Sequence, residues 1–230
     1  MPQLDTSPPE PRVWTARVLS NRQLSATGYE LKLSRDGADF RAGQLLTVHG
    51  ADLLHDRTYT IASGERDESL CILYRLIPSG LLTPQLAGLQ PGDPLKVSAP
   101  YGEFMLRDPA RPVVFIATGT GIAPCIAYRR TYPALQLTVL HGVRTEDDLF
   151  YRAELEAGAA YHACVSGHAG PTCFKGRVTA CATTLAFPPE AHFYLCGANE
   201  MFYEMRDLLE ARGIPLANVF SEAYYYRLDD

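Results

Sequence analysis

Arg111–Pro124 has the sequence RPVVFIATGTGIAP, an apolar run followed by a glycine-rich turn. The run Pro112–Ala117 has the length and the β-branched content of a buried strand. Gly119 and Gly121 allow a tight turn, and Pro124 suits the first turn of a helix. Such a helix presents free N–H groups and the positive end of its dipole to an anion. A strand, this turn and a helix in succession therefore favour a nucleotide-binding loop over a purely structural turn.

After this turn, apolar strand-like runs alternate with helical stretches. The expected strands are 112–117, 136–141, 161–165 and 191–196, and the expected helices are 123–131, 146–158 and 199–212. This alternation predicts a parallel sheet covered by helices on both faces. Before the turn, six shorter β-type runs lie at 13–20, 29–34, 44–49, 58–62, 70–76 and 95–98, with one helical turn near 83–87. Short strands at this spacing predict a small antiparallel barrel.

We therefore predict two domains, an antiparallel β-barrel followed by a Rossmann-like α/β domain with a parallel sheet. The pattern changes near Asp108–Arg111, so the barrel is expected at 13–108 and the α/β domain at 109–230. The first 12 residues have neither a basic start nor an apolar run, and they predict a flexible leader rather than a signal peptide.

Composition excludes several classes of protein. A hydrophobic fraction of 47% and a charged fraction of 20% are typical of a globular chain and argue against general disorder. The net charge of −5 argues against nucleic-acid binding, and no run approaches the roughly 20 apolar residues of a membrane helix. The six cysteines contain no C-x-x-C pair, which predicts reduced thiols in a cytoplasmic protein and excludes a plant-type iron–sulfur site. We expect a monomer.

One set of residues has the chemistry of metal ligands. His162, Cys164, His168 and Cys173 have the spacing H-x-C-x3-H-x4-C. This spacing matches no common zinc pattern, and a strand followed by a loop is the favoured interpretation. We therefore expect no metal site.

Two strand ends of the α/β half carry possible nucleotide-binding residues. The second strand ends in Leu140–His141–Gly142–Val143–Arg144. An arginine there cannot accept hydrogen bonds from a ribose diol but pairs well with a 2′-phosphate, which suggests NADPH over NADH. A solvated surface arginine is an equal alternative. The fourth strand ends in Cys196, followed by Gly197 for a sharp turn and Asn199 as an expected helix cap.

The barrel half carries a second set of possible ligand-binding residues. In Arg57–Thr58–Tyr59–Thr60, strand alternation places Arg57 and Tyr59 on one face, suited to a diphosphate and a flat aromatic ligand, and Thr60 on the other. Gly80–Leu81–Leu82–Thr83–Pro84 predicts a turn into a helix that Thr83 caps, a second anion-binding helix end.

Together these motifs resemble the ferredoxin–NADP(+) reductase family of flavoproteins. RTYT at 57–60 is similar to the family's R-x-Y-S/T, GLLT at 80–83 to its G-x-x-S/T, ATGTGIAP at 117–124 to its nucleotide loop, and CGANEM at 196–201 to its C-G-x-x-x-M. LHGVR at 140–144, FKGRVT at 174–179 and the ending SEAYY at 221–225 resemble the bacterial branch. The motifs occur in order over most of the chain.

The resemblance implies an FAD-binding barrel, an NADP(H)-binding α/β domain and a C-terminal tail at the flavin. The implied catalytic residues are Cys196, Thr60 and Tyr225. The implied FAD-binding residues are Arg57, Thr58, Tyr59, Thr60, Gly80, Leu81, Leu82, Thr83, Thr120, Glu222 and Tyr225. The implied NADP-binding residues are Gly119, Thr120, Gly121, Val143, Arg144, Arg177, Cys196 and Gly197.

Two departures from the bacterial pattern bear on these roles. Members often carry an arginine after the V-S/T that ends the third α/β strand, and here Gly167 follows Val165–Ser166, so one expected 2′-phosphate ligand is missing. The tail continues past Tyr225, so Tyr224 or Tyr226 is an alternative residue to stack on the flavin.

The resemblance implies that NADPH exchanges a hydride with flavin N5, and that the flavin exchanges single electrons with ferredoxin or flavodoxin. The cofactors carry this chemistry and the protein aligns them. An NAD(P)H-dependent flavin reductase or an oxygenase reductase component of the same fold is the alternative. A flavin-binding protein that does not turn over pyridine nucleotide is a third interpretation, and the complete nucleotide loop argues against it.

Overall fold

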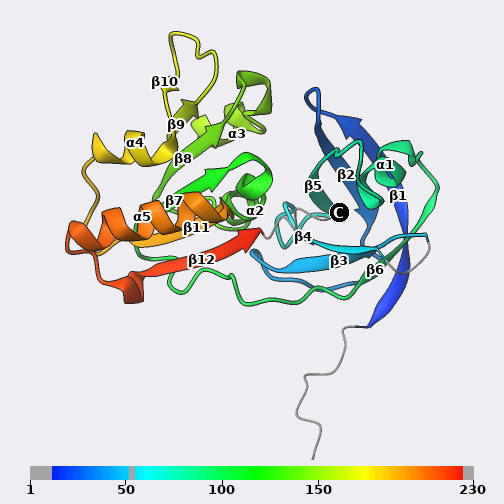
Figure 1. Cartoon of the computed structure of the whole chain (residues 1–230). Helices are drawn as coiled ribbons and strands as arrows, with labels where there is room; N and C mark the ends of the chain where they lie inside the picture. The colour runs from blue at the N-terminus through cyan, green and yellow to red at the C-terminus, as the bar shows by residue number, and fades with distance from the viewer. Residues whose placement is uncertain (1–11, 52–54, 225–230) are drawn as a thin grey trace, which may run out of the picture.

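The computed structural model describes residues 12–51 and 55–224 and contains two six-stranded sheets that follow one another along the chain (Figure 1). The expected leader therefore lies outside the described residues, except for Arg12. The elements of the first half are β1 (Val13–Gln23), β2 (Gly28–Ser34), β3 (Leu45–His49), β4 (Asp56–Thr60), β5 (Ser69–Arg75), α1 (Leu82–Gly88) and β6 (Pro94–Ser98). All six predicted strands and the helical turn of this half are confirmed.

The first sheet is antiparallel and curls until its two edge strands meet. Its strand order is β4-β3-β6-β1-β2-β5. A bridge between Ile61 and Ile72 and a hydrogen bond of 2.7 Å from the Ala62 N–H to the Cys71 carbonyl join the edges. Alternate side chains, among them Leu31, Leu33, Leu46 and Val97, fill the interior with apolar atoms. The predicted barrel is therefore confirmed as a near-closed one.

The second half has the predicted parallel sheet. Its strands are β7 (Val113–Thr118), β8 (Leu137–Val143), β9 (Ala160–Val165), β10 (Phe174–Lys175), β11 (His192–Ala198) and β12 (Val219–Tyr224). They lie in the order β10-β9-β8-β7-β11-β12. The helices are α2 (Ala123–Thr131), α3 (Arg152–Glu156), α4 (Val178–Thr183) and α5 (Asn199–Ala211), with short 3-10 turns η1 (Gly119–Ile122), η2 (Glu146–Asp148) and η3 (Leu216–Asn218).

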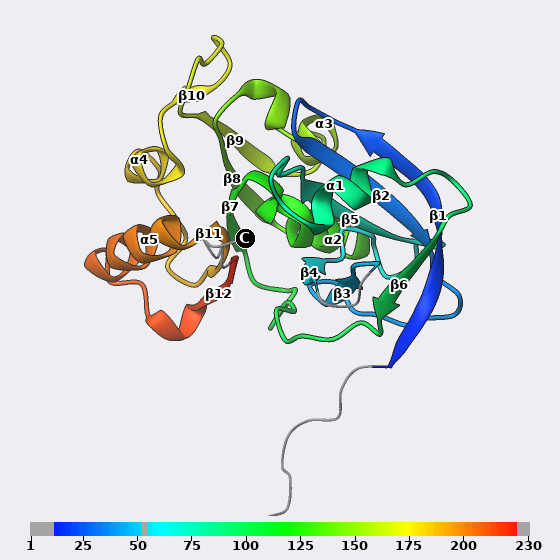
Figure 2. The same ribbon diagram turned by 45° about the vertical axis from the view of Figure 1, so that its right-hand side comes forward.

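Helices cover both faces of this sheet (Figure 2). Phe115 and Val139 pack with α2 and α3 on the face toward the barrel, while Val114 and Ile116 pack with α4 and α5 on the other face. This division follows from strand alternation, which sends successive side chains to opposite faces. Because both faces are buried, the strands are apolar almost throughout, as the sequence indicates.

Four elements of this half differ from the sequence prediction. The helix expected at 146–158 is divided into η2 and α3, because Tyr151 adopts a left-handed conformation with φ of 58° and interrupts the helical path. The edge strand β10 and helix α4 were not predicted. The stretch 219–224, expected as part of a tail, is strand β12, which pairs in parallel with β11.

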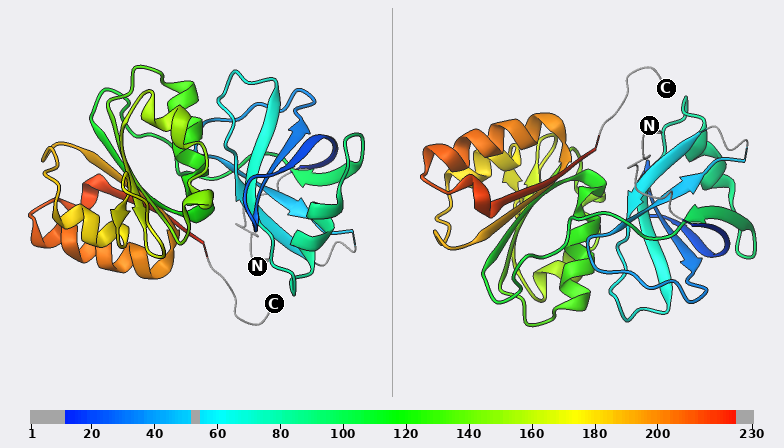
Figure 3. Two further views of the ribbon diagram at one scale, coloured as in Figure 1. Left: turned by 90° about the horizontal axis from the view of Figure 1, so that it is seen from above. Right: turned by 90° about the horizontal axis from the view of Figure 1, so that it is seen from below.

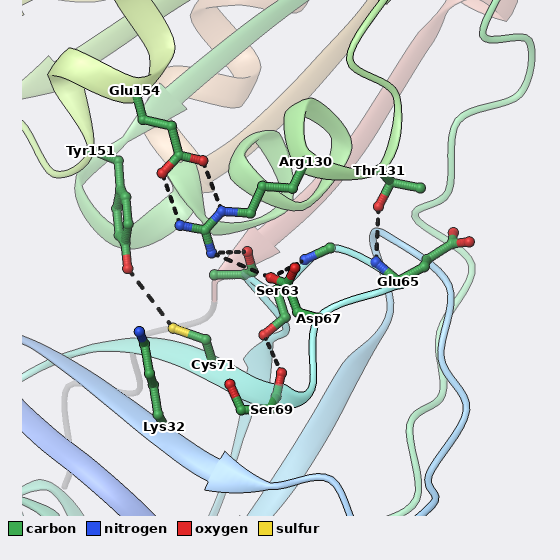
Figure 4. A network of polar contacts seen from close by, with 12 residues as sticks. Lys32, Ser63, Glu65, Asp67, Ser69, Cys71, Arg130, Thr131, Tyr151 and Glu154 are labelled. Carbon is green, nitrogen blue, oxygen red and sulfur yellow. Dashed lines mark hydrogen bonds and ion pairs between the residues drawn. The ribbon is translucent and has the colours of Figure 1, made fainter.

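The two halves pack side by side, with α2 and α3 at their junction (Figure 3). The Arg130 guanidinium of α2 donates two hydrogen bonds of 2.8 Å to the Glu154 carboxylate and one of 3.3 Å to the Ala62 carbonyl (Figure 4). The same guanidinium lies 5.0 Å from the ring centre of Tyr151. One charged side chain thereby joins α2, α3 and the barrel.

Candidate functional site

Three predicted site residues from different elements meet at the junction of the halves. Thr60 ends β4 of the barrel, and Cys196 and Glu222 are register partners on β11 and β12. The Thr60 hydroxyl donates a hydrogen bond of 2.6 Å to Glu222 Oε2, and the Cys196 sulfur lies 4.0 Å from the same oxygen. Thr60 and Cys196 are buried. A hydroxyl, a thiol and a carboxyl group therefore form one cluster.

The electrostatics of this cluster differ from those of a surface carboxyl. Burial raises the pKa of Glu222 above its ordinary value, and the hydrogen bond from Thr60 opposes this effect. The Glu222 carboxyl therefore holds a proton more readily than an exposed glutamate does.

A cleft of about 760 Å³ opens at the carboxyl ends of β7, β8 and β9 and extends to the barrel. Ligands of open α/β sheets bind at this edge, because successive strand ends and helix starts converge there. Five of the predicted nucleotide-binding residues line it, namely Gly119, Thr120, Val143, Arg144 and Arg177. The structure thus brings together three motifs that are far apart in the sequence.

Gly121 and Gly197 do not line this cleft. A Cβ at Gly121 would collide with the backbone carbonyl of Cys196, and Gly197 has φ of 131° with Thr118 against its Cα. The Ala198 N–H also donates a hydrogen bond of 2.9 Å to the Thr118 hydroxyl. These glycines therefore allow the turn after β7 to pack directly on the end of β11, which places Cys196 beside the nucleotide turn.

The basic residues of the cleft have different environments. Both Arg144 and Arg177 are exposed, but Arg177 Nη1 also lies 3.5 Å from Glu204 Oε1 of α5. Gly167 donates its N–H to the Arg144 carbonyl at 3.0 Å, and a Cβ at Gly167 would collide with that oxygen. At the position where the resemblance led us to expect an arginine, the backbone therefore leaves no room for a Cβ.

On the barrel side, β4 alternates as predicted. Arg57 is exposed and Tyr59 is half-buried on one face, while Thr60 is buried on the other. The Tyr59 ring packs edge-on against Tyr74 at 6.5 Å between ring centres. Thr58, between Arg57 and Tyr59, is exposed. Strand β4 thus places a guanidinium and a phenol ring on the same face.

Two predicted helix caps are wrong. Helix α1 begins after Leu81, and the Thr83 hydroxyl instead accepts a hydrogen bond of 2.9 Å from the Ile77 N–H. Thr83 therefore closes the turn that precedes the helix, a turn that contains Gly80 and the exposed Leu81, while Leu82 is buried in the barrel core. At α5 the flanking residue is Ala198, so Asn199 is the first helical residue and makes no side-chain cap.

The tyrosines predicted to stack on the flavin lie at or beyond the end of the described chain. Tyr225 and Tyr226 are outside the described residues, and Tyr224 is the last residue of β12. Of the four residues weighed as metal ligands, His162 and Cys164 lie on β9. Within residues 12–51 and 55–224, no group of three or more potential metal ligands occurs.

Sequence reasoning missed several residues of the cleft. Arg75 at the end of β5, the segment 26–28 before and at the start of β2, and Glu204 of α5 all line it. The residues from the barrel reach the cleft only because the halves pack together, and no local pattern signals this. Glu204 lies four residues after Glu200 and seven after Gly197, so its helical spacing was a usable signal.

Comparisons with known proteins agree with this geometry. A family model described as "Oxidoreductase NAD-binding domain" matches residues 115–207. The chain is 32% identical to ferredoxin–NADP reductase B of Sorangium cellulosum, over 91% of this chain and 96% of that protein. It is 31% identical to the toluate 1,2-dioxygenase electron transfer component of Pseudomonas putida, over 92% of this chain and 67% of that protein.

Some relatives are matched over only part of their length, and a solved structure has the same fold as this chain. The chain spans only 59% and 56% of two propane 2-monooxygenase reductase components. A ferredoxin NADP+ reductase from Neisseria gonorrhoeae, solved with FAD and NADP, has the same fold, with a TM-score of 0.82 at 19% identity over 94% of this chain and all of that one. No helix in the described part of the chain has the length and apolarity to cross a bilayer.

The two-sheet architecture, the cleft at the strand ends and the extent of these similarities lead to one conclusion. The chain belongs to the ferredoxin–NADP reductase-like family of FAD- and NAD(P)-binding oxidoreductases.

Proposed function

We propose that this protein is an FAD-dependent reductase that couples NADPH to a one-electron carrier protein such as ferredoxin or flavodoxin. The observation that carries the proposal is the meeting of Thr60, Cys196 and Glu222 beside the nucleotide cleft. Here a group from the barrel and groups from the α/β half contact one another, next to the turn that contains Gly121. We assign the barrel at 13–108 to FAD and the α/β half at 109–230 to NADP(H).

The residues of the barrel side fit FAD. Arg57 offers an exposed guanidinium for a diphosphate, and Tyr59 offers a half-buried ring for a planar group. The turn at Gly80–Thr83 is held by the Thr83–Ile77 hydrogen bond, so its backbone is fixed before any ligand binds. We propose that these residues hold FAD, together with Tyr225 of the tail.

The cleft residues fit a pyridine dinucleotide. Gly119 and Thr120 present main chain at the end of β7, where phosphate oxygens are expected. Arg144 and Arg177 supply positive charge at the far side of the cleft for a 2′-phosphate. The pairing of Arg177 with Glu204 reduces the charge available, so we propose a preference for NADPH over NADH that rests mainly on Arg144.

In this proposal the protein contributes alignment rather than strong acid or base catalysis. FAD, when bound, supplies the conversion between a two-electron hydride and single electrons. Thr60 and Cys196 border the place where the two ring systems approach, and their burial keeps water out of it. Glu222 orients the Thr60 hydroxyl through their hydrogen bond and can hold a proton there.

Support for a carrier-protein acceptor comes from the similarity to a ferredoxin–NADP reductase along most of its length. The Sorangium cellulosum reductase matches along 96% of its length, so nothing large in that relative lacks a counterpart here. The toluate dioxygenase component matches along 67%, and about a third of that protein has no counterpart. Because the cysteines of residues 1–230 lack the spacing of a plant-type iron–sulfur site, we propose that the one-electron centre lies outside these residues.

The test uses the purified protein reconstituted with FAD under anaerobic conditions. NADPH is expected to bleach the visible flavin absorbance, and a ferredoxin or flavodoxin is then expected to restore it. If NADPH and NADH both leave the absorbance unchanged, the proposed function fails. Failure to bind FAD at all would overturn it as well.

The second candidate is a reductase of an oxygenase system or of free flavin. The 31% identity to the toluate dioxygenase component favours it. Turnover with free FMN as acceptor, compared with turnover with ferredoxin, separates the two. Reduction of FMN alone would support this candidate and contradict the carrier proposal.

A further inference from the structure

A buried histidine connects the nucleotide turn to the interior of the parallel sheet. His141 lies on β8, directly before the cleft residues Gly142, Val143 and Arg144, and is itself fully buried. Its Nε2 lies 3.0 Å from the carbonyl oxygen of Gly119. Its Nδ1 lies 2.9 Å from the hydroxyl of Tyr161 on β9. None of the roles proposed above uses this side chain.

The contacts fix the protonation of the ring. Burial lowers the pKa of His141 to about 4, so the imidazole is neutral near pH 7 and carries one N–H. The Gly119 carbonyl can only accept, so that hydrogen is on Nε2. Nδ1 then accepts from the Tyr161 hydroxyl. Both ring nitrogens are therefore satisfied in a single tautomer, and the ring is held on two sides.

The carbonyl that His141 holds belongs to the peptide that begins the nucleotide turn. Gly119 has φ of 53°, and the unit Gly119–Thr120 lines the cleft, whereas His141 does not. In a planar trans peptide the C=O and the following N–H point in opposite directions. With its carbonyl directed inward to His141, this peptide turns the Thr120 N–H away from the sheet interior and toward the cleft.

We propose that His141 is a positioning residue, which aims the Thr120 amide at the diphosphate of the pyridine nucleotide by holding the Gly119 carbonyl. The inference rests on the proposed function and adds a residue to it. Gly119 has no Cβ to restrict its backbone, so the hydrogen bond from His141 adds to the short turn η1 in keeping this peptide in one orientation. Tyr161 orients His141 in turn, so it is the outer member of the same chain of hydrogen bonds.

Three variants test how far NADP+ binding depends on each hydrogen bond of His141. His141→Leu fills similar space and removes the donor to Gly119. Tyr161→Phe removes only the hydroxyl that orients the ring. His141→Gln keeps an amide N–H at about the position of Nε2 and is expected to restore most of the binding. His162→Leu is the matched control, because His162 lies on the neighbouring strand β9 and its ring makes no hydrogen bond to the nucleotide turn among the described residues.

The readout is the dissociation constant of NADP+, measured from the flavin difference spectrum of the FAD-loaded protein. We expect His141→Leu to weaken NADP+ binding about tenfold and Tyr161→Phe about threefold, in the range of one lost or loosened hydrogen bond. Binding of adenosine 2′-monophosphate, which keeps the 2′-phosphate but has no phosphate at the 5′ position of the diphosphate, is expected to change less than twofold. FAD content and melting temperature are measured for each variant, because a general structural defect would alter both.

The outcomes separate the inference from the proposed function. If the wild-type protein binds neither NADP+ nor NAD+, the proposed function fails. If wild type binds NADP+ and His141→Leu binds it equally well, the inference alone is overturned. Equal loss of NADP+ and adenosine 2′-monophosphate binding would also overturn it, because the effect would not run through the diphosphate. Should His141→Leu fail to fold, Tyr161→Phe and His141→Gln carry the same comparison.

Discussion

The two sides of the candidate site are built from different parts of the polypeptide. On the barrel side, side chains on strand β4 project toward the proposed FAD, with Arg57 and Tyr59 on one face. On the α/β side, the position of the nucleotide turn depends on main-chain packing, since the turn after β7 packs on the end of β11 through Gly121 and Gly197. Substitutions can change a site made of side chains by small steps. A site that depends on main-chain packing is disturbed only when a substitution moves the backbone.

The largest expected effect tests the main-chain side. Gly121→Ala places a Cβ against the Cys196 carbonyl and the Gly197 Cα, which are backbone atoms that cannot rotate away. We expect a loss of about 3 kcal/mol in the free energy of unfolding, typical of forced overpacking. Urea denaturation of the FAD-loaded protein measures it.

The control for this variant is Gly119→Ala in the same turn. Gly119 has φ of 53° but open space around its Cα, so only the left-handed strain of about 1–2 kcal/mol applies. A loss from Gly119→Ala as large as that from Gly121→Ala would show that conformation, rather than close packing, explains these glycines.

The comparison of the two sides of the site also explains which of its features could be predicted from the sequence. Strand alternation correctly predicts that Thr60 lies opposite Arg57 and Tyr59, because a period of two is a local property of the chain. The contact between Thr60 and Glu222 joins residues 162 positions apart, and no local pattern specifies it. The order of the strands brings them together.

Each wrong or missed prediction has an identifiable cause in the structure. Thr83 follows a cap pattern, yet its hydroxyl finds the Ile77 N–H six residues earlier and leaves the helix end without a side-chain cap. Tyr151 interrupts an otherwise helical stretch with a left-handed conformation, which its residue type does not suggest. Strand β12 was missed because only its pairing with β11 distinguishes it from a tail.

The second prediction compares charges within the cleft. Arg144→Ala removes an exposed guanidinium and is expected to weaken NADPH binding by about 2 kcal/mol, or roughly 30-fold, with little change for NADH. Arg177→Ala is expected to cost less, because Glu204 already engages that guanidinium. Titration of the flavin spectrum with each nucleotide measures both. Equal losses for NADPH and NADH would remove the 2′-phosphate from the explanation.

The third prediction concerns the joint between the two sides. Arg130→Met removes the paired hydrogen bonds to Glu154 and the bond to the Ala62 carbonyl while keeping an apolar stem. We expect a loss of about 1–2 kcal/mol in the free energy of unfolding, reduced from that of a fully buried pair because the two side chains are 24% and 36% exposed.

A double-mutant cycle with Glu154→Gln isolates the pair in this joint. We expect the two single losses not to add. Additive losses would mean that the Arg130–Glu154 contact itself contributes nothing to the free energy of unfolding.

The smallest effect is expected at the carboxyl group where the two sides meet. Glu222→Gln keeps the shape of the side chain and an oxygen that can accept the Thr60 hydroxyl hydrogen, but it removes the ionisable group. Burial raises the pKa of Glu222 in the folded protein above its value in the unfolded chain, so the unfolded state releases this proton first. The contribution of the protonated Glu222 to the free energy of unfolding is therefore fully present below the pKa that Glu222 has in the unfolded chain. This contribution is lost as the pH rises through the pKa that Glu222 has in the folded protein.

The difference in unfolding free energy between Glu222→Gln and wild type, measured from pH 4 to pH 8, isolates this group because all other titrations cancel. We expect the variant to gain on wild type as the pH rises, and the difference to be constant at the acid end, where both side chains are neutral. A difference that is flat across the range would mean that Glu222 is solvated as in the unfolded chain. A difference of the opposite sign would mean that a positive group stabilises the carboxylate, and the cluster with Thr60 and Cys196 would then bind charge rather than hold a proton.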